Sequence, residues 1–412
     1  MNPEKIERCF WLLFAGWLIL RSLLLWAQYT GDTDPAATGE VLRFFSQADI
    51  SAGREYALRG FWFKTVYGIL YASVLVALLR FGVFSDLWQR ANALAGAGTF
   101  RGDLLFILAF LLIIQLLSLP SAIYFGHFRE TAAGFARIDF AGWLLKHAKA
   151  VGLSVLFETI VFMLFLAVIR WFPGRWPFVV PVVMGGFALV VTFFVPLVIT
   201  PLFYNQQPLE QGEFREGLLK MADKAGMSVK EIYVIDESRY SSHTNAYFTG
   251  VGSFRRIVLY DTLIKSHTPD EAALIFAHEA GHWRHNHVAW GLSLGALGML
   301  FCCLAWFYIY GWLEPVSWFG LKGIDSAANI PFLIIIVMFL QLFVAPVESQ
   351  ISQFMERQAD RAALELTGLR DTYVNAQIRL SRDNKSELLP HPFRVFWLYT
   401  HPPAVERIKA AQ

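Results

Sequence analysis

The 412-residue sequence is poor in charge and in cysteine, and both shortages narrow its possible functions. Asp, Glu, Lys and Arg make up 17% of the residues, against roughly one quarter in a soluble domain. The formal net charge is only +2 and no basic run occurs, so no nucleic-acid partner is expected. The three cysteines, Cys9, Cys302 and Cys303, lie in or beside apolar segments, which argues against a disulfide framework or a CxxC metal site.

Hydrophobic residues are abundant instead, at 56% of the sequence, and aromatic residues reach 16%. This balance indicates an integral, multi-pass membrane protein in contact with the lipid bilayer. Crossing a bilayer takes about 20 residues of helix, and seven apolar stretches are long enough to do so. They are Phe10–Gln28, Phe61–Leu79, Leu104–Phe125, Val151–Ile169, Phe178–Phe203, Val288–Trp312 and Ile330–Val347.

Two amphiphilic segments interrupt this pattern, at residues 204–287 and 348–412. Because an even number of spans separates them, both lie on one side of the membrane and can form one soluble domain. The predicted division is therefore 1–203 for helices one to five, 204–287 for the first part of that domain, 288–347 for helices six and seven, and 348–412 for its second part. The basic loop residues Arg129, Arg137, Lys146 and Lys149 favour a cytoplasmic location for the domain.

The first soluble segment contains the signals of a small sheet. A helical pattern ends at Gly226, and three short strands are predicted at Ile232–Asp236, Asn245–Gly250 and Arg255–Leu263, with a turn over Gly250–Phe254. The predicted fold class is thus mainly α, a polytopic membrane protein of seven helices with an α+β domain.

A metal-binding pattern follows the sheet, in "FAHEAGHWRHNH" at residues 276–287. Thr268 as N-cap, Pro269 at the first position and Glu271 three residues after the cap predict a helix that contains the pattern. On a helix, His278 and His282 project from one face and can take two corners of a tetrahedral zinc site. Glu279 is rotated around the helix, so it suits a general base rather than a ligand.

The third ligand has to come from elsewhere. His285 and His287 are close by, but their spacing suits surface or supporting positions better than metal binding. A second helical pattern, "SQFMERQADRAALEL", places Glu356 and Asp360 one turn apart. Glu356 is the predicted ligand, and Asp360 suits a carboxylate that fixes an imidazole. The alternative is that both are solvated charges beside neighbouring arginines.

Several motifs together resemble one known family. They are "SSHTNAYFTG" (Ser241–Gly250), "RRIVLYDTLI", "HEAGHWRHNH", "ERQADRAAL" and "YTHPPAVERI" (Tyr399–Ile408). With seven spans, the chain resembles the type I CAAX prenyl endopeptidases, integral-membrane zinc metalloproteases with a glutamate as third ligand. The short loop at Gly311–Asn329 and the ending "KAAQ" favour a bacterial member, located in the inner membrane with the zinc domain cytoplasmic.

The resemblance implies a role for each residue of the motifs. His278, His282 and Glu356 would bind one Zn²⁺ per chain, and Glu279 would act as general base and acid. Asp360 would orient a zinc histidine, His278.

The resemblance also places residues of the tail and of one strand beside the metal. His401 and Arg407 would help to hold the substrate or the developing oxyanion. Without the resemblance, His401 would be only a residue at a helix start, and Arg407 would be only one partner of a structural ion pair. An exposed strand edge can hold a peptide by backbone pairing, so substrate contacts are expected from Asn245, Ala246, Tyr247 and Phe248.

Ionisable residues inside the spans leave two interpretations open. Arg21 and Glu158 are either structural charges, paired or snorkelling to the membrane interface, or residues that face a hydrated space between the helices. The resemblance implies the second, since the family's spans enclose a water-filled chamber.

The predicted function is membrane-embedded zinc endopeptidase, acting on peptides or membrane-protein substrates. Two alternatives fit parts of the sequence: a heat-shock-type quality-control protease of the membrane, and a seven-helix transporter or receptor with a structural metal.

Overall fold

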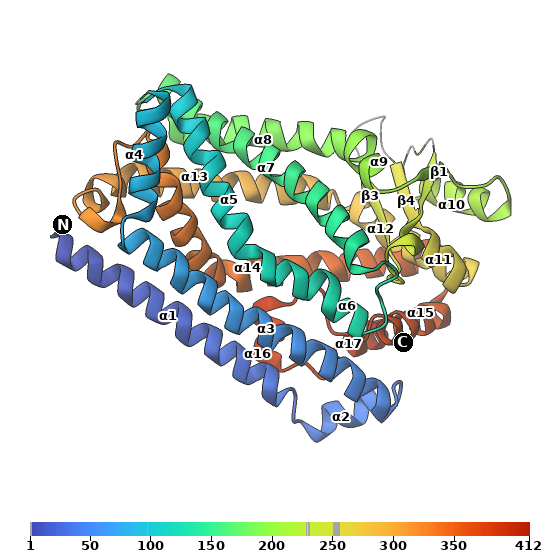
Figure 1. Cartoon of the computed structure of the whole chain (residues 1–412). Helices are drawn as coiled ribbons and strands as arrows, with labels where there is room; N and C mark the ends of the chain where they lie inside the picture. Colours follow the sequence, from blue (N-terminus) through green and yellow to red (C-terminus); the bar gives the residue numbers. More distant parts are fainter. Residues whose placement is uncertain (1, 97, 228, 230, 250–255) are drawn as a thin grey trace.

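The computed structural model describes residues 2–412 except 97, 228, 230 and 250–255, and for Phe248 and Thr249 it describes only the backbone. Within these residues, seven helices are long and apolar enough to cross a membrane, which confirms the predicted polytopic fold (Figure 1). They are α1 (Pro3–Thr30), α3 (Gln47–Arg80), α5 (Phe100–Ile123), α7 (Phe140–Trp171), α8 (Trp176–Phe194), α13 (His287–Leu313) and α14 (Ile330–Thr367).

Two of these helices continue through a π-helical turn into a short α-helix. The first is α5, which continues into η1 (Tyr124–Phe128) and α6 (Arg129–Ala132). The second is α8, followed by η2 (Val195–Ile199) and α9 (Thr200–Phe203). Pro120 in α5 and Pro196 in η2 lack the N–H that a regular helix needs, and wider turns of this kind accommodate such losses.

The last predicted span and the predicted Glu356 helix are one continuous helix. Composition changes from apolar to polar near Glu348, but α14 runs for 38 residues and ends only at Gly368, which has a φ of 70°. Pro346 lies inside it without ending it. The helix that anchors in the membrane therefore also carries the third predicted ligand.

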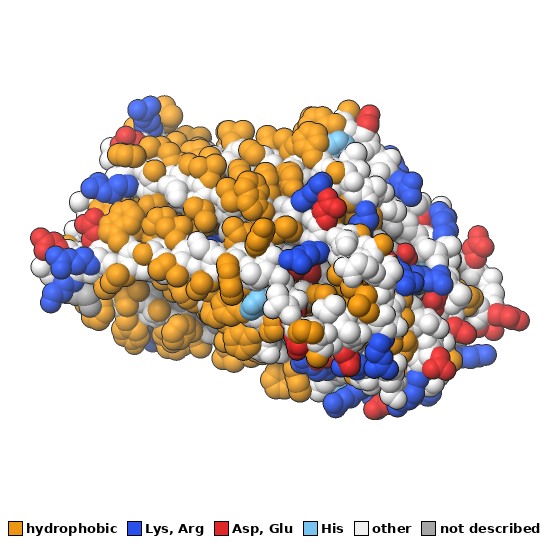
Figure 2. All heavy atoms as spheres, turned by 90° about the horizontal axis from the view of Figure 1, so that it is seen from below, with side chains coloured by type: hydrophobic (Ala, Val, Ile, Leu, Met, Phe, Trp, Pro, Cys, Tyr) orange, Lys and Arg blue, Asp and Glu red, His pale blue; other side chains and the backbone are white. Residues whose placement is uncertain are grey.

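Aromatic side chains fill the core at the end of the bundle far from the sheet. Phe10, Trp17 and Phe339 are each at most 4% exposed and pack against one another. This end is closed by α4 (Val83–Ala95) and two 3₁₀ turns, η5 (Ser317–Phe319) and η6 (Ala327–Asn329) (Figure 1). In Figure 2 hydrophobic side chains form a wide band over the bundle, while charged side chains lie at both ends of the molecule and are most numerous at the one opposite to α4.

The opposite end contains a four-stranded mixed sheet in the order β1-β2-β4-β3. Its strands are β1 (Gln206–Pro208), β2 (Ile232–Ile235), β3 (Ala246–Thr249) and β4 (Arg256–Tyr260). β2 and β4 are parallel, and the other pairs are antiparallel. β1 was not predicted, and β4 is shorter than expected because Asp261 already begins a helix. The predicted turn at Gly250–Phe254 lies outside the described residues.

The remaining helices are α2 (Pro35–Leu42), α10 (Glu213–Lys224), η3 (Glu237–Arg239), α11 (Asp261–Ser266), α12 (Pro269–Arg284), α15 (Arg370–Asp383), α16 (Pro392–Leu398) and α17 (Ala404–Ala411). Of these helices, α10, α11 and α12 pack around the sheet, α15 packs on α12 and α17 on α15, and α16 packs on α14 and α1. A second apolar core, with Ile257, Leu259 and Phe276 almost fully buried, joins the sheet to α12.

The intramembrane charges are not paired with each other. Within the described residues, Arg21 and Glu158 form no ion pair; Arg21 lies over the Trp17 ring and Glu158 accepts a hydrogen bond from Ser154. The interpretation as paired structural charges is therefore not supported. The hydrated chamber stays a prediction.

Candidate metal centre

Helix α12 carries two of the three predicted ligands, and its start is fixed by the predicted capping box. The Thr268 side chain accepts from the Glu271 backbone N–H, and the Glu271 side chain accepts from that of Thr268. The helix ends at Arg284, and Asn286, with a φ of 56°, turns the chain directly into α13. His278 and His282 therefore lie one turn apart near the end of a well-capped helix.

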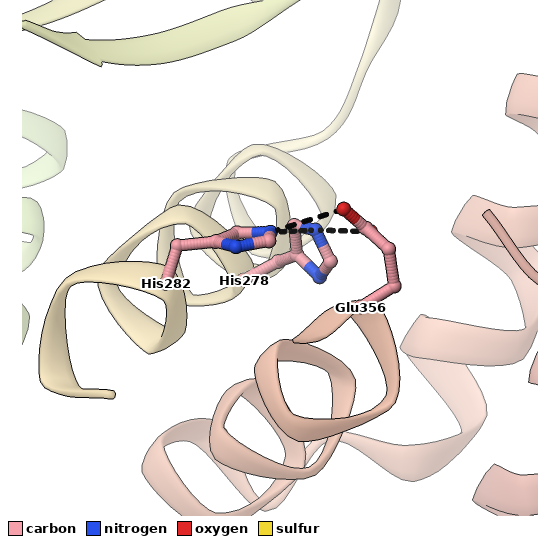
Figure 3. A group of neighbouring side chains, drawn as sticks. All are labelled: His278, His282 and Glu356. Atoms are coloured by element: carbon pink, nitrogen blue, oxygen red, sulfur yellow. Dashed lines mark hydrogen bonds and ion pairs between the residues drawn. The ribbon is translucent and has the colours of Figure 1, made fainter. Parts of the chain in front are cut away.

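Close packing of α12 on α14 brings the third ligand to the two imidazoles. A Cβ added at Gly281 would lie 2.9 Å from the Cα and O of Ala359 and from the Cβ of Ala362. Only glycine permits this approach, because anything larger meets backbone atoms of the other helix. Glu356, one turn before the contact on α14, is thereby placed opposite His278 and His282 (Figure 3).

The three ligand groups converge on one point. Nε2 of His278 and Nε2 of His282 are 3.2 Å apart, and each lies 3.3 Å from a carboxylate oxygen of Glu356. A tetrahedral zinc ion with bonds of about 2.0–2.2 Å holds its ligand atoms about 3.3–3.5 Å apart. Oε2 of Glu356 is buried with no hydrogen-bond partner among the described residues. The donor set and its spacing therefore fit one divalent metal ion.

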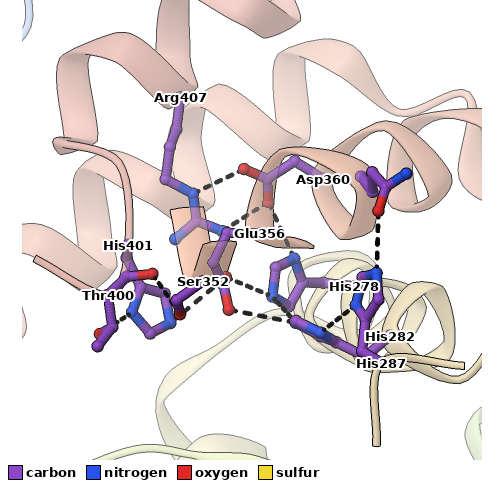
Figure 4. Close-up of polar contacts among 10 residues, drawn as sticks. His278, His282, His287, Ser352, Glu356, Asp360, Thr400, His401 and Arg407 are labelled. Atoms are coloured by element: carbon purple, nitrogen blue, oxygen red, sulfur yellow. Dashed lines mark hydrogen bonds and ion pairs between the residues drawn. The ribbon is translucent and has the colours of Figure 1, made fainter. Parts of the chain in front are cut away.

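Each imidazole is oriented by a partner on its other nitrogen (Figure 4). Nδ1 of His278 lies 2.9 Å from Oδ1 of Asp360. Nδ1 of His282 lies 2.8 Å from Nδ1 of His287, whose Nε2 is 3.1 Å from Oε1 of Gln358. When Nδ1 of His278 donates to Asp360, and Nδ1 of His282 donates to Nδ1 of His287, both ligand Nε2 atoms keep a free lone pair for the metal.

Arg407 supports this arrangement through Asp360. Its Nε and Nη2 donate to the two carboxylate oxygens of Asp360 at 2.9 and 2.6 Å. Such a two-point pair fixes the carboxylate in one plane. Contact of Arg407 with the substrate or an oxyanion stays a prediction, and Arg407 also lines the cavity next to Glu279. The ion pair considered in its place is present.

His401 lies on the open side of the three ligands. Its Nε2 is 3.3 Å from Oε2 of Glu356, and its side chain is 56% exposed. The Thr400 hydroxyl is 2.9 Å from the other ring nitrogen, and the Ser352 hydroxyl of α14 donates to the Thr400 carbonyl. His401 is thus held beside the ligands while one face stays accessible.

The Glu279 side chain lines a cavity next to the three ligands. A cavity of about 160 Å³ is lined by Glu279, His278 and His401, and also by Asn245 and Arg407. Burial raises the pKa of the Glu279 carboxyl, and the two neighbouring imidazoles oppose this shift. A carboxylate with a raised pKa next to a metal site is suited to take and return a proton.

The predicted substrate strand lies at the edge of the sheet. β3 pairs with β4 on one side, and within the described residues no strand pairs with its other side. Asn245 precedes it, and its backbone carbonyl accepts from the Tyr260 N–H. The backbone of residues 246–249, which includes Ala246, Tyr247 and Phe248, thus presents a free edge beside α12.

Some residues around the site have no counterpart in the sequence prediction. Gln358 was not considered, and neither were Gln377 and Ser381, two largely buried polar residues of α15 that line a second pocket of about 630 Å³. That pocket shares Asn245 and His401 with the smaller cavity. The sequence signal for them is that Gln377 and Ser381 are four residues apart, which places both on one face of α15.

Substituting Gly281 tests whether helix spacing sets the ligand geometry. We expect Gly281→Ala to lower the free energy of unfolding by about 1–3 kcal/mol, because its Cβ forces α12 and α14 apart. Metal affinity should fall at least about tenfold, as expected when ligands lose their orientation. Thermal unfolding and a metal-competition titration measure the two effects.

A glycine on α10 provides the control. Gly217 has no heavy atom within 4 Å of an added Cβ, so Gly217→Ala should be neutral or stabilising by roughly 1 kcal/mol through helix propensity. Equal behaviour of the two variants would show that the contact at Ala359 does not set the ligand spacing.

Comparison with known proteins gives one consistent result. Residues 208–412 match the model of peptidase family M48, and residues 32–205 match that of the CAAX prenyl protease N-terminal region with five membrane helices. CAAX prenyl protease 1 of Saccharomyces cerevisiae is 29% identical over 374 residues, covering 84% of this chain and 82% of that protein.

A plant relative and a solved structure extend this match over the chain. The CAAX prenyl protease 1 homolog of Arabidopsis thaliana is 29% identical over 403 residues, covering 91% and 90% of the two chains. The crystal structure of S. mikatae Ste24p superposes with a TM-score of 0.82 at 25% identity, covering 97% of this chain and 98% of that one.

Proposed function

Because the chain belongs to peptidase family M48, as a membrane metallopeptidase of the CAAX prenyl protease type, we propose that its metal is one zinc ion held by His278, His282 and Glu356. The convergence of these three donor groups at separations of 3.2–3.3 Å is the observation that carries the proposal. Two imidazoles and a carboxylate suit zinc and leave one position for the reaction. The transporter or receptor alternative is wrong, since the family is one of peptidases.

Bound zinc supplies Lewis-acid activation of the scissile carbonyl and of a water molecule. The protein's own groups move the protons. Glu279 takes a proton from the attacking water, holds it on its carboxyl group, and gives it to the nitrogen of the departing amine.

The other polar groups of the site either stabilise the developing oxyanion or position a metal ligand. His401, beside Oε2 of Glu356 and accessible on one face, is placed to donate to the developing oxyanion. Arg407 acts through Asp360, which in turn orients His278. The catalytic contribution of Arg407 is therefore one of positioning.

We propose that the peptide substrate adds to the free edge of β3 and crosses the metal centre. Backbone pairing along residues 245–248 requires no particular side chains, so it suits a range of peptides or membrane proteins. If the peptide runs antiparallel to β3, the residues after the cut lie near Asn245, where the two pockets begin.

Proteins with a CAAX sequence are the substrates that the names of the relatives suggest. We propose that the catalytic domain, built from residues 204–287 and 348–412, faces the cytoplasm from a bacterial inner membrane. The weak excess of basic residues in the third loop is the support for this orientation. Cleavage of peptides with a C-terminal motif, compared with an unfolded membrane protein, separates CAAX-type specificity from quality control.

Removal and return of the metal tests the cofactor. We expect phenanthroline to abolish peptide cleavage by the purified full-length protein, and stoichiometric Zn²⁺ to restore it, because no protein group replaces the lost Lewis acid. Elemental analysis should find one zinc per chain. Full activity in a metal-free preparation would disprove the proposal, as would recovery with another divalent ion but not with zinc.

A further inference from the structure

A basic pocket of about 370 Å³ is lined by residues of α3, of η1 and α6, and of the turn after α15. Its polar walls include Tyr56 and Arg59 of α3, Arg129 of α6, and Lys385 of the turn. None of these residues belongs to the metal site. The two helices are joined here by the Tyr56 hydroxyl, which donates to Glu130 at 2.8 Å.

The pocket lies at the level where the apolar parts of two spans end. The apolar stretch of α3 begins at Phe61, two residues after Arg59, and that of α5 ends near Phe125, four residues before Arg129. Trp62 and Phe128 beside it are more than half exposed, as expected of aromatic residues at a membrane interface. Lipid headgroups would therefore lie at the depth of the pocket, on the side of the metal centre.

The acidic groups around the pocket already have partners. Glu55 pairs with Arg59 at 2.5 Å on the helix surface. Glu130 accepts from Tyr56 and lies 2.8 Å from Nε2 of His243. Neither carboxylate is therefore free to take another cation at close range.

Two of the basic groups keep unused donors. The Arg129 guanidinium lies 3.6 Å from the centre of the Tyr56 ring, and its Nε is buried with no hydrogen-bond partner among the described residues. Its Nη1 lies 3.6 Å from Oε1 of Glu130, which makes an ion pair without a hydrogen bond. Lys385 donates to the Ala133 carbonyl, and no carboxylate pairs with it within the same residues. Three basic side chains, Arg59, Arg129 and Lys385, thus face two carboxylates, Glu55 and Glu130, which leaves the pocket with one surplus positive charge.

We propose that this pocket binds the phosphate group of an anionic phospholipid from the leaflet on the side of the metal centre. Basic pockets between membrane helices recognise such headgroups by charge and by hydrogen bonds to the phosphate oxygens. The exposed Trp62 and Phe128 contact the upper part of the acyl chains. A free phosphate ion shares the headgroup chemistry but gains nothing from these apolar neighbours, which favours the lipid.

Lipid binding by the full-length protein tests the proposal. Phosphatidylglycerol and phosphatidylcholine are titrated separately into the detergent-solubilised protein, and native mass spectrometry counts bound lipid. We expect phosphatidylglycerol to bind at least about tenfold more tightly than phosphatidylcholine. Arg59→Gln and Arg129→Gln should each weaken its binding about fivefold, the effect of removing one basic residue near an anionic surface.

Lys149→Gln is the matched control. Lys149 is an exposed basic residue near the start of the apolar part of α7 and does not line the pocket, so its loss should leave phosphatidylglycerol binding unchanged. Arg59 is exposed, so its variant is expected to fold even if the Arg129 variant does not.

Three results would overturn the assignment. The two lipids could bind equally, or the Arg59 variant could match the Lys149 variant. Inorganic phosphate could also displace phosphatidylglycerol at concentrations similar to those of the lipid, which would assign the pocket to the free ion instead.

Discussion

Glu279→Gln should reduce peptide cleavage by about a thousandfold, within the range that general acid–base catalysis contributes. Glutamine has nearly the size and shape of glutamate, but its amide cannot accept a proton from water and return it to the amine. Glu279 is not one of the three converging donor groups, so the variant should still contain one zinc per chain. Single-turnover cleavage of a fluorescent peptide and elemental analysis of the same preparation measure both properties.

A surface glutamate gives the matched control for this variant. Glu365 lies on α14, 65% exposed and 3.3 Å from Arg284, so Glu365→Gln changes the same functional group away from the site. It should cleave at the wild-type rate. If the Glu279→Gln variant cleaved peptide at the wild-type rate, Glu279 would not be the base. If the variant lost its zinc, Glu279 would be a metal ligand instead.

The local features of the site could be predicted because their signals lie close together in the sequence. The capping box of Thr268 and Glu271 and the one-turn spacing of His278 and His282 both occur within one helix. The seven spans were predicted for a similar reason, since about 20 consecutive apolar residues are sufficient evidence for each. The approximate positions of three strands followed from alternation and turn residues.

Contacts between distant segments could not be predicted from such patterns. The position of Arg407 on Asp360 depends on how α17 packs, 47 residues further along the chain. The chain of contacts from His282 through His287 to Gln358 needs α12, α13 and α14 to meet at one place. Gly281 controls that meeting, yet glycine inside a helix has several possible explanations in a sequence alone.

Two errors of element boundaries have simpler physical causes. A change in composition near Glu348 suggested the start of a new segment, but a helix ends at a stop signal, and the first effective one is Gly368. β1 has three residues and includes a proline, so it lacks the alternation that identifies strands. Its pairing with β2 defines it only in the folded sheet.

The continuity of α14 has a consequence for how the metal acts on the fold. One end of this helix packs among the membrane helices, and the other end bears Glu356 against α12. A metal ion that bridges Glu356 to His278 and His282 therefore joins the membrane bundle to the domain that contains the sheet. Loss of that bridge should affect stability as well as catalysis.

Glu356→Ala should remove most of the bound zinc and abolish cleavage. Structural zinc sites with four protein ligands bind with an apparent free energy of about 10–16 kcal/mol, so one ligand contributes roughly 3 kcal/mol, or more than a hundredfold in affinity. Elemental analysis after dialysis should find far less than one zinc per chain. Added zinc should raise the unfolding temperature of the wild-type protein but not that of the Glu356 variant.

Comparison with Asp360→Asn separates the loss of a metal ligand from the loss of a residue that only orients a ligand. Asp360 touches His278 and Arg407 but not the point where the three ligand groups converge, so its variant should keep zinc with about 10–100-fold weaker affinity. Saturating zinc should therefore restore cleavage to the Asp360 variant and leave the Glu356 variant inactive. If saturating zinc restored both, the third ligand would have to be another group, and His401, 3.3 Å from the Glu356 carboxylate, is the nearest candidate in position to replace it.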